Sequence, residues 1–301
     1  MRLATFRQKI KPWMLPIAML LGVLFHDSIG HVAFLSRYLI FTMLLITYCR
    51  LKTSDFHVGR YIWLLLAAQI GGAVGVYLLI RPFDEVLAQG AFICVFCPTA
   101  TAAPVITGML GGSVGRVAVY SFFSHISVAL LAPLLLTWIG GEGTAIGFAD
   151  SLLAIARSVL PLILGPLAIA ALMGRFAPKA KEAVAGHQGL SFYIWAVALL
   201  IVVGNSVSFL MREPASAIPQ ILLLALAALI ACVLQFGLGR KIGARYADRV
   251  SGAQSLGQKN TVLAIWLALT YLNPLASAAP AAYVAWHNIV NSWQIYRSGK
   301  R

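Results

Sequence analysis

Acidic residues are scarce in this chain. Only nine of its 301 residues are Asp or Glu, against 23 Lys and Arg, and charged residues of both signs make up 11% of the composition. Soluble domains carry roughly 25% charged residues, whereas 60% of this chain is hydrophobic. This composition excludes an ordinary soluble protein and predicts an integral membrane protein. The net charge of +14 does not predict a nucleic-acid partner, because the basic residues lie between apolar runs instead of on one soluble face.

Cysteine is also rare. The four cysteines, at positions 49, 94, 97 and 232, lie within or at the edges of apolar runs. Cys94 and Cys97 form a C-x-x-C pair, but neither a second pair nor a histidine cluster completes a metal site. The sequence also shows no Ser-His-Asp set. We therefore expect no metal, no cofactor and no enzymatic activity.

Long hydrophobic runs are abundant, and their number predicts an all-α integral membrane protein. One transmembrane helix needs about 20 apolar residues, so the chain has room for about ten spans. The first run lacks a small-x-small cleavage site, so we interpret it as a retained helix and not as a signal peptide. The predicted spans are 12–26, 31–49, 61–80, 87–110, 116–139, 152–174, 188–211, 217–239, 254–272 and 279–296.

The basic residues are unevenly distributed between the two predicted sides of the membrane. With a cytoplasmic N-terminus, eighteen of the 23 Lys and Arg residues fall on the inner side, and the outer loops hold only Arg81 and Arg212. Cytoplasmic loops carry such an excess of positive charge. The bias predicts ten spans with both termini cytoplasmic, in the inner (cytoplasmic) membrane of a bacterium. The sequence does not imply an oligomer.

Ten spans divide into two halves of five, residues 1–139 and 140–301, and an odd number of spans per half forces the second copy to be inverted. Weak internal similarity supports two repeats, since the first span contains Met14-Leu15-Pro16-Ile17 and the sixth contains Val159-Leu160-Pro161-Leu162. The fourth and ninth spans, which are equivalent in the two halves, are each interrupted by polar and helix-breaking residues. The interruptions are 97–104 and 255–260. Paired broken helices of this kind are typical of a transporter's binding site near the bilayer midplane.

Prolines in the first break favour an irregular backbone at depth. Pro98 and Pro104 remove hydrogen-bond donors and free carbonyl groups, which a membrane tolerates only where protein or water surrounds them. Pro104 suits the first turn of a new half-helix, whose positive end could face an anion.

Lys259 lies in the second break, and all nine acidic residues fall in loops or at span ends. A charged side chain at the bilayer centre costs roughly 2.5 kcal/mol or more. We therefore expect Lys259 to be solvated, deprotonated or paired with an anionic ligand. His125, four residues after Ser121 on one face of the fifth span, is the second ionisable group at depth. Either a hydrogen-bonded packing role or a proton-carrying role fits it.

These residues resemble the bile acid:sodium symporter family over essentially the whole chain. The resemblance implies ten helices in two inverted five-helix repeats, with broken helices four and nine crossing. It also implies a core domain of spans 3–5 and 8–10 that moves against a panel of spans 1, 2, 6 and 7. The matching motifs are Cys97-Pro98, Thr101-Ala102, Gly257 with Asn260, Leu263-Ala264 and Trp286-His287-Asn288.

The resemblance also implies a substrate and its site. The family transports small organic anions across the lipid bilayer, so bile-acid-like or other carboxylate metabolites are the expected substrates. The implied substrate-binding residues are Thr99, Thr101, Pro104, Asn260, His287 and Asn288.

This chain departs from the family pattern at the sodium sites. The family's ninth helix usually reads Glu-x-Gly-x-Gln-Asn, and here Ser255 and Lys259 replace the two sodium-site residues. In the fourth helix, Ala103-Pro104 replaces a Ser-Asn pair. Hard cations need several oxygen ligands, commonly with a carboxylate, so bound Na⁺ is doubtful. The positions equivalent to the cation sites are Gln69, Ser121, His125, Ser255, Gln258 and Lys259.

Our hypothesis from the sequence is a sodium-independent organic-anion transporter that works by alternating access. In it Lys259 replaces a bound cation, and transport is facilitated or coupled to protons through Lys259 and His125, because a buried lysine can titrate. Two alternatives stay open: a conventional sodium:organic-anion symporter, and a membrane sensor that keeps the fold without transporting.

Overall fold

The computed structural model describes residues 14–50, 58–100, 103–140 and 148–298, and this part of the chain is almost entirely helical. Within these ranges, three short 3-10 helices join longer elements: η2 (Gly30–Val32), η4 (Ala215–Ala217) and η5 (Pro274–Ser277). The α-helices are α2 (Met14–Leu24), α3 (His26–Ile29), α4 (Leu35–Cys49), α5 (Arg60–Ile80), α6 (Glu85–Phe96), α7 (Ala103–Met109), α8 (Val114–Gly140), α9 (Phe148–Phe176), α10 (Pro178–Gly186), α11 (Gln188–Leu210), α12 (Ile218–Ala244), α13 (Arg249–Gly257), α14 (Thr261–Tyr271) and α15 (Ala278–Ser298).

Each predicted span coincides with one helix or with two helices separated by a break. The predicted fourth span is α6 and α7, and the predicted ninth span is α13 and α14. The sequence did not predict the short helices α3 and α10, which lie in connections between spans. The structure therefore agrees with a helical membrane protein.

Helix length and composition identify only some of the predicted spans as membrane-crossing. Among the described residues, three segments are long and apolar enough to cross a membrane: Arg60–Ile80, Val114–Gly140 and Ala215–Ala244. A fourth is possible if His26–Val32 and Leu35–Ile46, which are bent by 71° at their junction, form one span. The ten crossings, the inverted repeat and the cytoplasmic position of both termini stay predictions, and residues 1–13 and 299–301 lie outside the described residues.

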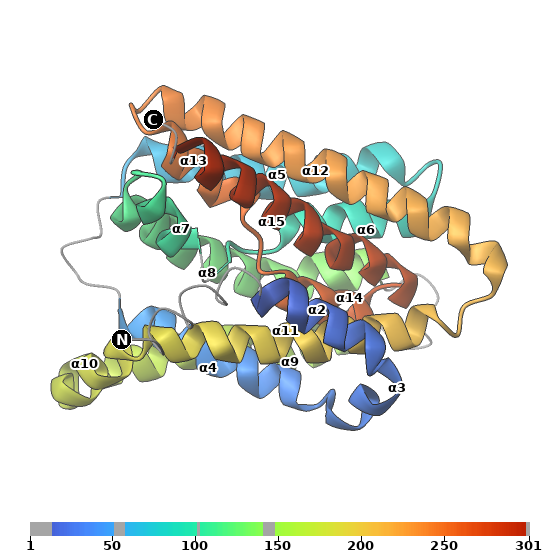
Figure 1. Cartoon of the computed structure of the whole chain (residues 1–301), viewed down its shortest axis with the longest axis horizontal. Coiled ribbons are helices and arrows are strands. Elements are labelled where there is room, and N and C mark those ends of the chain that lie inside the picture. Colours follow the sequence, from blue (N-terminus) through green and yellow to red (C-terminus); the bar gives the residue numbers. More distant parts are fainter. Residues whose placement is uncertain (1–13, 51–57, 101–102, 141–147, 299–301) are drawn as a thin grey trace.

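The helices gather in two groups, which Figure 1 shows on opposite sides of the molecule. In one group, α11 packs against α2 and α4, and α4 packs against α9. In the other group, α12 packs against α6, α13 and α15. Contacts of α8 with α9 and of α14 with α11 join the groups. The division into a panel and a core, and the movement of one against the other, stay predictions.

The first arms of the two broken helices begin in the same way. Asp84 caps α6 by accepting a hydrogen bond from the Leu87 amide at 2.8 Å, and Asp248 caps α13 by accepting one from the Ser251 amide at 3.0 Å. An N-terminal carboxylate satisfies an orphan amide and interacts favourably with the helix dipole. Both arms then run into the interior, where 88–100 and 251–265 are buried throughout.

Candidate functional site

Two extended segments cross antiparallel where the broken helices are interrupted. The Ala100 amide donates to the Gln258 carbonyl at 3.1 Å, and the Asn260 amide donates to the Pro98 carbonyl at 2.8 Å. Thr99 and Lys259 face each other between these two bonds. We call this the crossing, residues 97–100 and 258–260. It brings the C-terminal ends of α6 and α13 to the same place as the N-terminal end of α14.

The C-terminal carbonyls of α6 all accept hydrogen bonds from side chains of other helices or of the crossing. Lys259 Nζ donates to the carbonyls of Val95 at 2.7 Å and Cys97 at 3.0 Å. The Gln69 amide donates to Phe96 at 2.7 Å and to Cys97 at 3.2 Å, and the Gln235 amide donates to Cys94 at 3.2 Å. The last carbonyls of a helix have no intrahelical partner, and a cation there interacts favourably with the helix dipole.

Lys259 is therefore held in a way that the sequence interpretation omitted. Its side chain is 1% exposed, and none of the ion pairs among the described residues includes it. The sequence leaves three states open for this side chain: solvated, deprotonated or paired with an anionic ligand. The structure adds that its Nζ lies against two backbone carbonyl oxygens at the negative end of a helix dipole, which can stabilise a cation without an acidic partner.

Gln69 uses its whole hydrogen-bonding capacity within the protein. Its amide nitrogen bonds to α6, while its carbonyl oxygen accepts from the Tyr120 hydroxyl at 2.5 Å and the Ser124 hydroxyl at 2.8 Å. An amide oxygen has two lone pairs. Both lone pairs of the Gln69 oxygen are thus taken by α8 hydroxyls, so this predicted cation-site residue offers no free oxygen to an ion.

Neutral groups satisfy the C-terminal end of α13. The Thr99 hydroxyl donates to the Ser255 carbonyl at 2.8 Å, and the Tyr283 hydroxyl donates to the Gly257 carbonyl at 2.9 Å. The Gln258 side chain turns back to Gln254, to which its amide donates at 3.1 Å. Of the predicted cation-site residues, Gln258 thus lies in the crossing. Ser255 is linked to the crossing by the bond that its carbonyl accepts from Thr99.

Asn260 and Pro104 begin the second arms of the two broken helices. Asn260 caps α14, since its side-chain oxygen accepts from the Leu263 amide at 3.2 Å, and its buried amide nitrogen has no partner among the described residues. Pro104 is buried in the first turn of α7, as the sequence predicts. Thr101 lies outside the described residues. Asn260 could therefore donate to a ligand at the crossing.

His125 and Ser121 bond to each other on α8. Nδ1 of His125 lies 2.7 Å from the Ser121 carbonyl oxygen and 3.4 Å from its hydroxyl oxygen. The His125 ring also stands edge-on to Tyr48 of α4, with ring centroids 6.0 Å apart. No hydrogen bond among the described residues links His125 to the crossing. The geometry fits the packing role better than a direct relay with Lys259.

His287 and Asn288 differ in their relation to the crossing. His287 is fully buried and stands edge-on to Tyr283, with ring centroids 5.6 Å apart, and neither of its ring nitrogens has a partner among the described residues. Asn288 donates to the Val284 carbonyl of its own helix at 2.8 Å. His287 therefore contacts Tyr283, whose hydroxyl bonds to Gly257 directly before the crossing. The described bond of Asn288, by contrast, stays within its own helix.

Sequence reasoning missed the residues that hold the crossing from outside the two breaks. Tyr120, Ser124, Gln235 and Tyr283 belong to three different unbroken helices, and each of them bonds to a residue of the site. One signal could have found them: each is a polar side chain within a predicted apolar span, where polar groups are expensive and tend to be functional.

The comparisons with known proteins bear on the chain as a whole. No protein-family model matches it. A relative described as the uncharacterized sodium-dependent transporter YocS, of Bacillus subtilis (strain 168), is 23% identical over 238 residues, which cover 78% of this chain and 70% of the relative. The similarity extends over most of both chains, so it is not confined to one isolated motif.

Proposed function

We propose that this chain is a secondary transporter of small organic anions, such as bile-acid-like or other carboxylate metabolites, and that it works by alternating access without sodium. The similarity to a protein named as a transporter and the paired broken helices in a helical membrane protein support transport. One observation supports sodium independence: the Lys259 ammonium donates hydrogen bonds to the carbonyl oxygens of Val95 and Cys97.

The argument against sodium is one of available ligands. In broken-helix transporters, coupling ions are bound by unwound carbonyls and by the C-terminal ends of half-helices. Here the ammonium already occupies two such carbonyls of α6. The oxygen of Gln69 is taken by two hydroxyls. A sodium ion at this end of α6 would have to displace these bonds and would be repelled by the fixed positive charge.

The same ammonium can serve an anionic substrate. A buried positive charge close to the N-terminal end of α14 makes the crossing electropositive. Asn260 adds an amide donor without a described partner. A carboxylate at the crossing would therefore be stabilised by fixed groups. Transport would then be facilitated diffusion, which needs no coupling ion. Coupling to protons is the variant in which Lys259 loses its proton during the cycle and its bonds to α6 weaken.

A conventional sodium:organic-anion symporter is the second candidate, and the name of the Bacillus subtilis relative favours it. In that case sodium would bind at residues other than those the family resemblance implies. The two candidates make opposite predictions for transport in the absence of sodium.

The deciding experiment is uptake into proteoliposomes. Labelled taurocholate and labelled pantothenate serve as probes, in counterflow, at constant pH and membrane potential, with Na⁺ or with N-methylglucamine outside. We expect a transported probe to enter at the same rate in both media. A rate that falls at least tenfold on removing sodium would overturn sodium independence and favour the symporter.

A matched variant makes the experiment sharper. Ser255→Glu combined with Lys259→Gln restores the sodium-site residues of the family pattern. We expect this double variant to acquire a sodium requirement that the original protein lacks. If the variant remains independent of sodium while it still transports, Lys259 does not replace a cation.

A further inference from the structure

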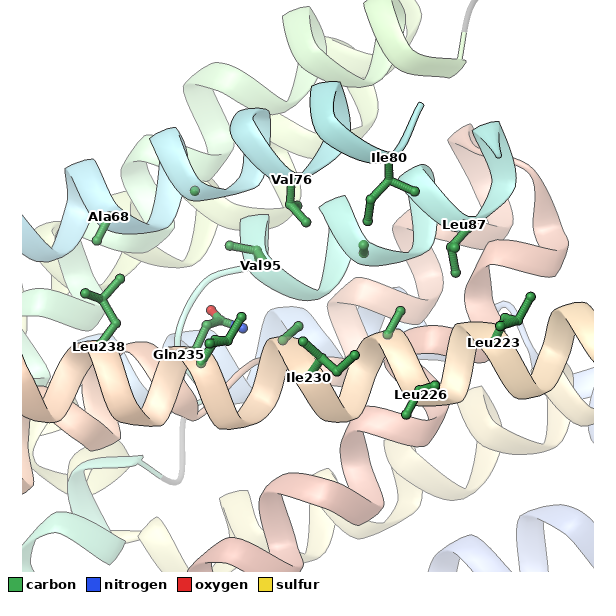
Figure 2. A pocket seen from close by; sticks show the side chains of 15 residues that line it. Ala68, Val76, Ile80, Leu87, Val95, Leu223, Leu226, Ile230, Gln235 and Leu238 are labelled. Atoms are coloured by element: carbon green, nitrogen blue, oxygen red, sulfur yellow. The ribbon is translucent and has the colours of Figure 1, made fainter. Parts of the chain in front are cut away.

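A long apolar groove lies between α5 and α12, with α6 between them, and Figure 2 shows it from close by. Its volume is about 540 Å³, and all of the 15 residues that line it are apolar except Gln235. The amide nitrogen of Gln235 is already bonded to the Cys94 carbonyl and the Tyr283 hydroxyl, and its carbonyl oxygen has no partner among the described residues. The groove therefore suits a hydrocarbon and not a polar metabolite.

The shape and position of the groove fit one extended acyl chain. Along α12 the lining runs from Leu223 to Leu238, which is roughly 20 Å at the helical rise of 1.5 Å per residue. Leu226 and Leu234 of this wall are 51% and 63% exposed. Both α5 and α12 are long and apolar enough to cross a membrane. The groove would therefore open toward lipid.

The two ends of the groove differ in charge. Beyond Leu238, the groove-lining stripe of α12 continues to the exposed residues Lys241 and Arg245, three and seven positions further on. At the opposite end, beside Leu87, Asp84 accepts two bonds from the Gln220 amide at 2.9 and 3.0 Å. Arg81 follows the lining residue Ile80 at this same end, but it pairs with Glu85 at 3.1 Å. Charge complementarity thus favours an anionic group at the Lys241 end over the Asp84 end.

We propose that this groove binds one acyl chain of an anionic phospholipid, and that Lys241 and Arg245 hold its phosphate. Arg60, which opens α5 at the same end of the groove, adds a third positive charge. Clusters of basic residues beside a membrane helix attract anionic lipids by about a fivefold gain in affinity per residue. The proposal is independent of the transported substrate and of sodium.

The bound chain would touch the residues that hold the crossing. Val95 lines the groove with its side chain, and its carbonyl oxygen accepts the Lys259 ammonium at 2.7 Å. Gln235 lines the same groove and bonds to the end of α6. A lipid in the groove would therefore support the C-terminal end of α6, and we expect it to raise the thermal stability of the protein.

The test is native mass spectrometry of the delipidated protein in detergent, with phosphatidylglycerol or phosphatidylcholine of identical acyl chains. We expect one tightly retained lipid and at least fivefold more retention of phosphatidylglycerol. Ala227→Phe fills the groove and should abolish retention of both lipids. Its control is Val233→Phe, which adds a ring to the same helix about 120° away around its axis, at a position that is 56% exposed and outside the lining.

The phosphate contact has its own matched pair. Lys241→Gln should lose most of the preference for phosphatidylglycerol, whereas Arg240→Gln, about 100° away around α12, should keep it. Equal retention of the two lipids by the original protein would overturn the proposal, as would equal effects of the two substitutions in either pair. If Ala227→Phe fails to fold, the Lys241 and Arg240 variants decide the question.

Discussion

The two broken helices meet at one crossing but satisfy their exposed carbonyls with different chemistry. The end of α6 receives an ammonium and two side-chain amides, from Lys259, Gln69 and Gln235. The end of α13 receives two neutral hydroxyls, from Thr99 and Tyr283. The two breaks are thus alike in their extended, paired backbone and different in charge, and one residue supplies the difference.

The difference predicts which substitutions at the crossing should cost the most stability. Hydrogen bonds to a charged group contribute about 1.5–3 kcal/mol each, and neutral ones about 0.5–1.5 kcal/mol. The two bonds from Lys259 are therefore the strongest at the α6 end, and the amides of Gln69 and Gln235 add neutral ones. The α13 end has only the two neutral hydroxyl bonds of Thr99 and Tyr283 among the described contacts.

The largest effect should follow from Lys259→Ala. The substitution removes two charge-assisted bonds and leaves the Val95 carbonyl, among the described contacts, without its side-chain donor. We expect a loss of at least about 3 kcal/mol of stability, measured by thermal or chemical unfolding in detergent. Lys179→Ala, at an exposed position of α10, is the control and should change stability by less than about 0.5 kcal/mol.

The same variant tests whether the ammonium stands in for a cation. Removing the side chain frees two carbonyls and a space between them. We therefore expect sodium chloride, relative to choline chloride at equal ionic strength, to raise the unfolding temperature of Lys259→Ala and to leave the original protein unchanged. A similar response of both proteins to sodium would contradict the substitution of an ion by Lys259.

Much of the asymmetry could be anticipated from the sequence, because its signals are local. Proline and glycine within apolar runs locate both breaks, and Pro104 indicates the start of α7. The absence of acidic residues at depth identifies Lys259 as an unusual charge. Long apolar runs and the basic loops predict helices that coincide with those of the structure.

The partners of Lys259 could not be anticipated, because they depend on how two distant segments cross. Its contacts join residues separated by 162 and 164 positions, and nothing in the local sequence fixes the depth at which α6 ends. Gln235 and Tyr283 escaped notice for the same reason. Each is a polar side chain within a predicted span, and only packing shows that they bond to the ends of α6 and α13.

A second, smaller effect should distinguish how the first arms are held against α12. A methyl group on Gly252 would collide with backbone atoms of Gly239 and Gly243, whereas one on Gly90 would meet mainly the flexible end of Leu224. Backbone cannot yield as a side chain can. Gly252→Ala should therefore destabilise by about 2–3 kcal/mol and Gly90→Ala by about 1 kcal/mol or less. Unfolding in detergent measures both, and equal losses would show that the α13 arm is not the more tightly held one.

The smallest effect should come from the neutral end. Thr99→Val keeps the shape of the side chain but removes the hydroxyl that donates to the Ser255 carbonyl, and we expect a loss of about 1 kcal/mol. Thr42→Val is the control, because the Thr42 hydroxyl bonds within its own exposed helix turn and its loss should be nearly neutral. Combining Thr99→Val with Lys259→Ala then measures the coupling between the two breaks. Additive losses of stability would mean that the carbonyls at the ends of α6 and α13 are satisfied independently. A coupling energy above about 0.5 kcal/mol would mean that the backbone pairing of Thr99 with Lys259 makes the stability of one break depend on the other.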